Sequence, residues 1–173
     1  MNETIKNLIE RRSCRNYKDE QIKEEELNEI LKAGMYAPSG MGLQSPKMIV
    51  LQNKEVIQKL SKLNASVMGR DTDPFYGAPT VIVVLADKTK NTYIEDGSLV
   101  LGNLMNAAYS LGIASCWIHR AKEEFETEEG KSLLNEWNIS SDYVGIGHCI
   151  LGYPNGPLQA PKARKEDYIT IIK

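Results

Sequence analysis

Apolar residues recur every three or four positions in several segments of the chain, and this spacing predicts helices. The expected helices begin at Asn2 or Thr4, at about Lys23, after Asn53, at about Tyr93 and after Thr127. Pro38 should end the second helix, and Gly112 should cap the fourth at its C-terminus. The fourth helix, about Tyr93–Leu111, has little polar surface, so we expect it in a core or an interface.

Shorter apolar runs between these helices predict strands at Lys47–Gln52, Val81–Ala86, Ile113–His119, Tyr143–Leu151 and Tyr168–Ile172. The run VIVVLA, residues 81–86, is continuously apolar, which is typical of a strand buried on both faces. Gly145 and Gly147 stand two residues apart, so they are expected to share a face that another backbone or a flat ligand can approach.

The order of these elements indicates the fold class. Short strands are interspersed with helices and no β–α–β unit repeats, which favours an α+β fold over a doubly wound one. The length of 173 residues fits a single domain spanning the whole chain. Residues 154–173 form a tail with no packing partner nearby in the sequence, so we expect it to pack at a distance or on another subunit.

Composition and charge narrow the classes of partner. Apolar residues make up 42% and charged residues 25% of the chain, which is ordinary for a globular protein. A net charge of −2 argues against nucleic-acid binding, whereas a small anion needs only a local basic cluster. No secretory signal is visible and the longest apolar run is too short to cross a bilayer. We therefore expect a soluble, cytoplasmic protein without membrane contact.

Side chains that commonly perform catalysis are scarce. The 3 cysteines form no CxxC pair and are expected as small, buried apolar residues, and the 2 histidines have no carboxylate at metal-ligand spacing. No P-loop, GxGxxG or GxSxG motif is present, although spacing alone does not exclude a Ser-His-Asp triad. The sequence thus predicts no metal site and favours a cofactor as the carrier of the chemistry.

One basic segment is suited to hold a phosphate. Arg11, Arg12 and Arg15 surround Ser13 directly after the first helix, and guanidinium groups bind phosphate through paired, charge-assisted hydrogen bonds. The alternative is that they complement the dipole at the helix C-terminus and otherwise face water. A second basic cluster follows Pro161, and the glycine- and proline-rich loop 37–46 either presents backbone amides to a ligand or is a plain connection.

These segments together resemble the nitroreductase family. The resemblance rests on RRSCRNY, APSGMGLQSP, FYGAPTVIVVLAD, EDGSLVLGNLMNAAYSLGIASCWIH, GIGHCILGYP and PKARK, which occur in family order and at family spacing over nearly the whole chain. It implies a homodimer of α+β subunits, each with a mostly antiparallel central sheet flanked by helices. Two FMN sites would lie at the subunit interface, and the C-terminal extension would reach the partner subunit.

The resemblance also implies roles for particular residues. Arg11 and Ser13, with Arg12 alongside, would hold the phosphate and ribityl end of FMN, and Arg15 would lie near the pyrimidine side as an electrostatic group. The remaining expected contacts are Lys162 and Arg164 at the phosphate, Pro38, Ser39 and Gly40 from the other subunit, and the backbone of Ala114, Ser115 and Cys116 along the ring. This chain departs from many members at Gly42, where they carry Asn, and at Lys47, where they carry Trp.

The implied activity is that of an FMN-dependent oxidoreductase. NADH or NADPH would reduce the flavin, and a small acceptor such as a nitroaromatic or a quinone would then take the electrons; no side chain need act as a nucleophile. The alternatives are an FMN-binding or storage module without turnover, a specialised flavin reaction on the same fold, and an α/β module for another phosphorylated ligand. The choice of donor, the acceptor and one- or two-electron reduction stay open.

Overall fold

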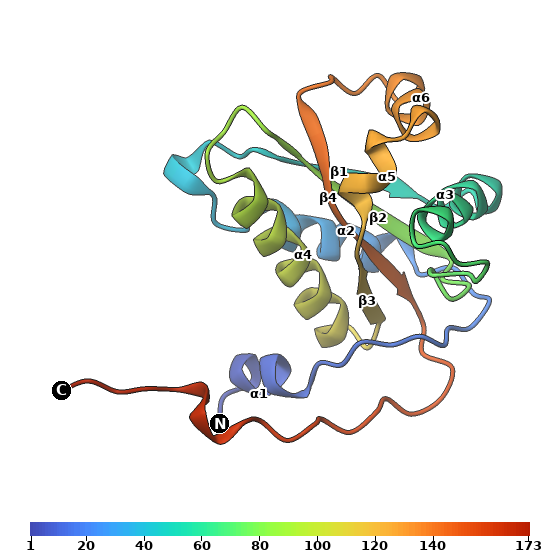
Figure 1. Cartoon of the computed structure of the whole chain (residues 1–173). Helices are drawn as coiled ribbons and strands as arrows, with labels where there is room; N and C mark the ends of the chain where they lie inside the picture. The colour runs from blue at the N-terminus through green and yellow to red at the C-terminus, as the bar shows by residue number, and fades with distance from the viewer.

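A computed structural model describes residues 1–173 and shows one sheet with helices on both faces (Figure 1). The helices are α1 (Glu3–Glu10), α2 (Glu24–Met35), α3 (Lys54–Val67), α4 (Tyr93–Ser110), α5 (Ala121–Glu126) and α6 (Glu128–Glu136), with the 3-10 turns η1 (Gly40–Gly42) and η2 (Glu166–Tyr168). The strands are β1 (Pro46–Leu51), β2 (Thr80–Asp87), β3 (Ala114–Ile118) and β4 (Tyr143–Gly152). The α+β class is confirmed.

The sheet has the strand order β1-β2-β4-β3, and every neighbouring pair is antiparallel. β2 and β4 are therefore central, while β1 and β3 form the edges. All residues of β2 from Thr80 to Ala86 are buried, as the apolar run VIVVLA predicted. Such burial on both faces requires a layer of helices above and below the sheet.

Two hydrophobic clusters fill these layers. On one face, α2 and α4 pack against alternate β2 residues through Ile30, Leu101 and Leu104. On the other face, α3, α5 and α6 pack against the intervening β2 residues. The α4 helix thus lies in the core along one side, as predicted, although Ile94 and Leu99 remain on the surface. None of the helices combines the length and the hydrophobicity that a membrane-spanning segment requires.

The predicted helix ends are confirmed by their hydrogen bonds. The Asn2 side chain accepts the Ile5 N–H at 2.9 Å, and the Asn53 side chain caps α3 in the same way. Thr127 Oγ1 accepts the Gly130 N–H at 3.0 Å at the start of α6. Gly112 follows the end of α4 with a φ of 74°, a left-handed conformation that glycine adopts without steric cost.

Gly145 and Gly147 do not share a face, so that prediction was wrong. Gly147 pairs with Val84 and Gly145 with the adjacent Leu85, which leaves Ile146 as an extra residue in β4. This bulge reverses the alternation, because an extra residue shifts all later side chains to the other face. A Cβ on Gly145 would lie 2.2 Å from the carbonyl oxygen of Ala121, so close approach of another backbone, α5, does occur there.

The secondary structure of the C-terminal residues and of α5 was not predicted correctly. Residues 168–172, in which apolar and polar side chains alternate, form no strand, because no strand of the sheet lies beside them to pair with. They lie in η2 and in the extended tail that follows it. Ile169, Ile171 and Ile172 are exposed instead, and in Figure 1 the tail runs away from the sheet. The short α5 helix was missed because its sequence, AKEEFE, is mostly charged and carries no repeated apolar spacing.

The contact between β4 and α5 makes a matched pair of substitutions informative. Gly145→Ala should lower the free energy of unfolding by about 3 kcal/mol, since its methyl group meets rigid backbone. Gly147→Ala should cost only about 1 kcal/mol, because the nearest atoms belong to the Trp117 and Leu101 side chains, which are able to move. Urea titrations of both variants measure the difference; equal losses would contradict the assignment of the two glycines to opposite faces.

Candidate functional site

The arginine segment lies along the free edge of β3. Ser13 and Ser115 form a parallel bridge, and the Cys14 N–H donates to the Ser115 carbonyl at 2.9 Å. Residues about a hundred positions apart are therefore adjacent, and Arg11–Arg15 meet Ala114–Cys116 within one subunit. Ser115 and Cys116 are both buried, and the pairing also covers an edge that would otherwise present unpaired backbone groups.

The guanidinium groups of this segment carry uncompensated positive charge. Arg11, Arg12 and Arg15 take part in none of the chain's ion pairs, all of which involve lysine or histidine. Arg12 Nη1 donates to the carbonyls of Ile9 and Arg11 at 2.6 and 2.5 Å. Arg11 Nη1, Arg12 Nε and Ser115 Oγ are buried and have no hydrogen-bond partner. Buried donors are normally paired, so these unpaired N–H and O–H groups are suited to bind an anion by donating hydrogen bonds to it.

Tyr76 belongs to the same site, although sequence reasoning did not single it out. The Arg15 guanidinium lies 5.9 Å from the centre of the Tyr76 ring, within the range of a cation–π interaction. Tyr76 has a φ of 53°, and Asp73 fixes the backbone on both sides by accepting the N–H groups of Phe75 and Gly77 at 2.8 and 2.7 Å. The DPFYG sequence was the available signal, because Asp, Pro and Gly favour tight turns.

The tail begins beside the arginine segment. The Lys18 N–H donates to the Tyr153 carbonyl at 2.9 Å, and the Asn155 N–H donates to the Asn16 carbonyl at 3.0 Å. Beyond this point the tail is exposed, and the side chains of Lys162 and Arg164 make no hydrogen bond or ion pair. In a single subunit these two cationic side chains are therefore exposed and without a polar partner.

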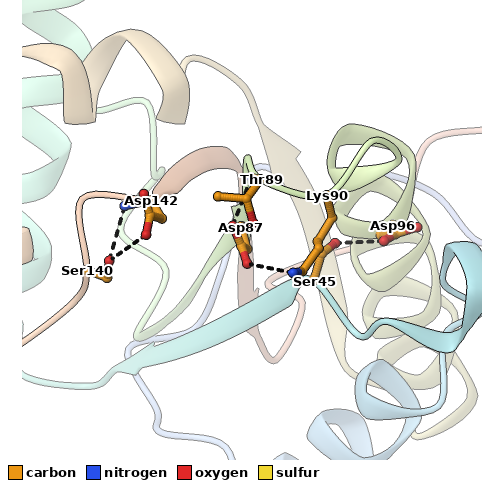
Figure 2. Close-up of polar contacts among 7 residues, drawn as sticks. All are labelled: Ser45, Asp87, Thr89, Lys90, Asp96, Ser140 and Asp142. Carbon is orange, nitrogen blue, oxygen red and sulfur yellow. Dashed lines mark hydrogen bonds and ion pairs between the residues drawn. The ribbon is translucent and has the colours of Figure 1, made fainter.

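The loop with Pro38, Ser39 and Gly40 lies at the N-terminal end of α4, whereas α1, which precedes the arginine segment, lies near its C-terminal end (Figure 1). The Gly40 N–H donates to Asp96 in the first turn of α4 at 2.9 Å, and Figure 2 shows Asp96 bonded to Ser45 of the same loop. Near the other end of α4, the Asn7 side chain of α1 donates to the Asn106 carbonyl. Ten helical residues separate these contacts, which corresponds to about 15 Å. Within one subunit, the Pro38–Gly40 loop thus lies apart from the arginine segment that follows α1.

The sequence matches a known family over most of its length. A sequence profile of the Nitroreductase family matches residues 8–153, which include the arginine segment, the loop, the sheet and α4. The chain belongs to the nitroreductase family. Its fold is the nitroreductase fold, with an antiparallel sheet between two layers of helices.

Relatives within this family share most of their length with this chain. A protein of Archaeoglobus fulgidus named NADH dehydrogenase/NAD(P)H nitroreductase is 35% identical over 159 residues, covering 89% of this chain and 87% of its own. The crystal structure of a nitroreductase with bound FMN from Bacteroides fragilis superposes with a TM-score of 0.92 at 29% identity, covering 100% of both chains. A nitroreductase with bound FMN from Desulfitobacterium hafniense gives 0.90 at 30% identity, again over 100% of both.

The cysteines are buried and free, which agrees with their predicted role as small apolar residues. Burial raises the pKa of Cys116, and Arg15, Ser13 and Arg11 oppose the shift only in part. Burial also raises the pKa of Cys149, which is fully enclosed. Both thiols therefore stay protonated near neutral pH and are poor nucleophiles.

These raised pKa values predict a loss of stability at alkaline pH. An unfolded thiol ionises near pH 8.5, whereas each folded thiol ionises at a higher pH, so each group lowers the free energy of unfolding by up to about 1.4 kcal/mol per pH unit between its two pKa values. The free energy of unfolding should therefore fall between pH 8 and 9.5, and Cys149→Ala should flatten the fall. Val84→Ala, in the same hydrophobic cluster, should lower stability without changing the slope. Denaturant titrations across this range distinguish the two effects.

Proposed function

We propose that this protein is an FMN-dependent oxidoreductase that passes reducing equivalents from NADH or NADPH to small acceptors such as nitroaromatics or quinones. The observation that carries the proposal is the set of buried, unpartnered donors at Arg11, Arg12 and Ser115. They lie on a chain that superposes over its full length on nitroreductases crystallised with FMN. The NADH and NADPH donors follow from the name of the Archaeoglobus relative.

The residues around the β3 edge fit FMN chemically. Arg11 and Arg12 would bind the phosphate and ribityl end together with Ser13, because the two arginines combine uncompensated positive charge with unpaired buried donors. The backbone at Ala114–Cys116 would border the ring. Lys162 and Arg164 would approach the phosphate once the tail is packed, since both are exposed and unpaired in a single subunit.

When bound, FMN supplies the hydride- and electron-transfer chemistry that no side chain of this site offers. The protein's part is then to bind, orient and provide charge. Arg15 would supply positive charge at the pyrimidine side, where reduction makes a flavin more negative. The Tyr76 ring would hold the Arg15 guanidinium in place, since the two lie 5.9 Å apart.

The active form would be a homodimer. The Pro38–Gly40 loop and the arginine segment lie near opposite ends of α4 in one subunit, so a second subunit would bring its loop to these arginines. Apolar side chains also remain uncovered in a single subunit: Ile5, Leu8 and Ile9 of α1, Ile94 and Leu99 of α4, and Ile169, Ile171 and Ile172 of the tail. Burial of these residues against a partner would stabilise the dimer, with the tail wrapped around it.

A reducing compartment suits this protein. All its cysteines are free and buried, and cytoplasmic proteins keep their thiols reduced. We propose the cytoplasm as its location.

A visible spectrum of the purified protein tests the function directly. Protein reconstituted with FMN under argon should show flavin absorption that bleaches on addition of NADH or NADPH and returns when a nitroarene or a quinone is added. Flavin that stays oxidised with both donors would favour a binding or storage module instead. A protein that takes up no FMN would contradict the proposed cofactor.

Arg15 allows charge to be separated from binding. Arg15→Gln should slow flavin reduction by roughly tenfold to a hundredfold, since one electrostatic contact in a site can contribute several kcal/mol. FMN affinity should fall far less, because the phosphate contacts stay intact. Stopped-flow reduction and fluorescence titration measure the two effects, with the exposed Arg70→Gln as the matched control. Equal losses in rate and affinity would exclude the electrostatic role.

A further inference from the structure

The loop from Pro38 to Ser45 has a backbone shape that depends on outside support. Met41, Gly42 and Gln44 have φ values of 53°, 67° and 49°, and only the second of these is a glycine. Left-handed conformations are unfavourable for residues with a Cβ and persist only where neighbouring contacts hold them. The side chains at the tip supply little of that support, because Met41 is 87% exposed and Leu43 is 45% exposed.

The support comes from one buried carboxylate at the start of α4. Asp96 is 2% exposed; its Oδ1 accepts the Gly40 N–H at 2.9 Å and its Oδ2 accepts the Ser45 hydroxyl at 2.7 Å (Figure 2). The two contacts lie on either side of the left-handed residues, so a single side chain bonds both ends of the strained stretch; at the second end the Ser45 carbonyl also accepts the Asp87 N–H at 3.0 Å. Inside the loop, the Gln44 N–H donates to Ser39 Oγ at 3.1 Å.

The loop also sits directly on the residue before α4. A Cβ on Gly40 would lie 2.2 Å from Thr92 Oγ1, so only glycine allows this approach. Burial alone would raise the pKa of Asp96, but hydrogen bonds from Ser45, Gly40 and Thr92 hold it below its usual range. The carboxylate is therefore ionised at neutral pH, in the first turn of a helix whose dipole favours negative charge.

No cation pairs with Asp96. The nearby Lys90 forms its ion pair with Asp87 at 3.8 Å instead, as Figure 2 shows. Hydrogen-bond donors of the loop itself therefore stabilise the negative charge. The ionised carboxylate of Asp96 and the conformation of the loop thus depend on each other. If this position served only to fill space in the core, an apolar side chain would do so without these hydrogen bonds.

We propose that Asp96 is a positioning residue for the flavin site, holding the Pro38–Ser45 loop in the shape in which it completes the FMN site of the other subunit. The proposal rests on the proposed function and on the loop's role in the dimer. It assigns Asp96 an action through the loop and across the interface, without contact with FMN. Loss of the carboxylate would leave the Gly40 N–H and the Ser45 hydroxyl unpaired and let the left-handed residues relax.

FMN affinity of graded variants tests the proposal. Asp96→Ala should weaken FMN binding about tenfold or more, and Ser45→Ala about threefold, in proportion to the hydrogen bonds each removes. Asp96→Asn should stay within about twofold of the unmodified protein, because the amide can accept from Gly40 and donate to Ser45 Oγ. Asp142→Ala is the control, since this exposed carboxylate bonds only to Ser140 of its own turn (Figure 2).

Mixed dimers test whether the loop acts across the interface. Co-expression of Arg11→Ala and Asp96→Ala subunits with different tags gives a dimer in which one site combines intact arginines with an intact loop from the other subunit. About half of the tight FMN sites should return in the mixed dimer, although both parent homodimers bind weakly. If the loop acted within its own subunit, no tight site would return, and the proposal would be wrong.

Two affinity results would contradict the proposal, and a proteolysis measurement tests it without flavin. Unchanged FMN affinity in Asp96→Ala, or an equal loss in Asp142→Ala, would overturn the proposal. If Asp96→Ala fails to fold, as judged by circular dichroism and sedimentation velocity, Ser45→Ala replaces it in both experiments. Chymotrypsin cleavage near Leu43 in the FMN-free protein should be faster in Asp96→Ala than in the unmodified protein. That measurement needs no flavin, so it stands even if the protein binds no FMN and the proposed function fails.

Discussion

The burial of β2 on both faces is the constraint from which the rest of the architecture follows. A strand without a solvated side needs two helical layers and a neighbour on each edge, and β1 and β4 supply those neighbours. β3 then becomes an outer strand, and its free edge is taken by Ser13 and Cys14. The arginine segment therefore lies at the β3 edge of the sheet. The loop before β1 lies at the other edge, because β1 is the outer strand on that side.

Buried polar groups also link the elements on the face of the sheet that α3, α5 and α6 cover. Glu124 and His148 are both fully enclosed and lie 2.6 Å apart, and the Asn64 side chain bridges Glu124 to the His119 carbonyl. This ties α3, α5 and β4 together beside the close backbone contact at Gly145. A buried pair of this kind adds little net stability compared with apolar packing, but it tolerates few alternative arrangements. It holds the chain at the C-terminal end of β3, where His119 follows the strand.

Local sequence information was sufficient for most elements and insufficient for the contacts between them. Helical spacing and capping residues such as Asn53 and Thr127 depend on neighbours within one turn, so they were predictable. The bulge at Ile146 depends on how closely α4 and α5 approach β4, and no pattern within β4 reveals it. The candidate site shows the same division: the arginine segment was visible, but its position against Ser115 and the pairing of Arg15 with Tyr76 arise only in the folded chain.

The turn at Tyr76 and the Pro38–Ser45 loop are held by aspartate side chains in a similar way. Asp73 accepts N–H groups on both sides of Tyr76, and Asp96 accepts the N–H that precedes Met41; each strained residue has a φ of 53° and an exposed side chain. Such conformations cost about 1–2 kcal/mol each, and the folded protein bears that cost before any ligand arrives. Binding to loops that are already ordered loses less conformational entropy than binding to loops that must be ordered. Carboxylates remote from the ligand can thereby raise its affinity, which is why removal of Asp96 should weaken binding without removing a single ligand contact.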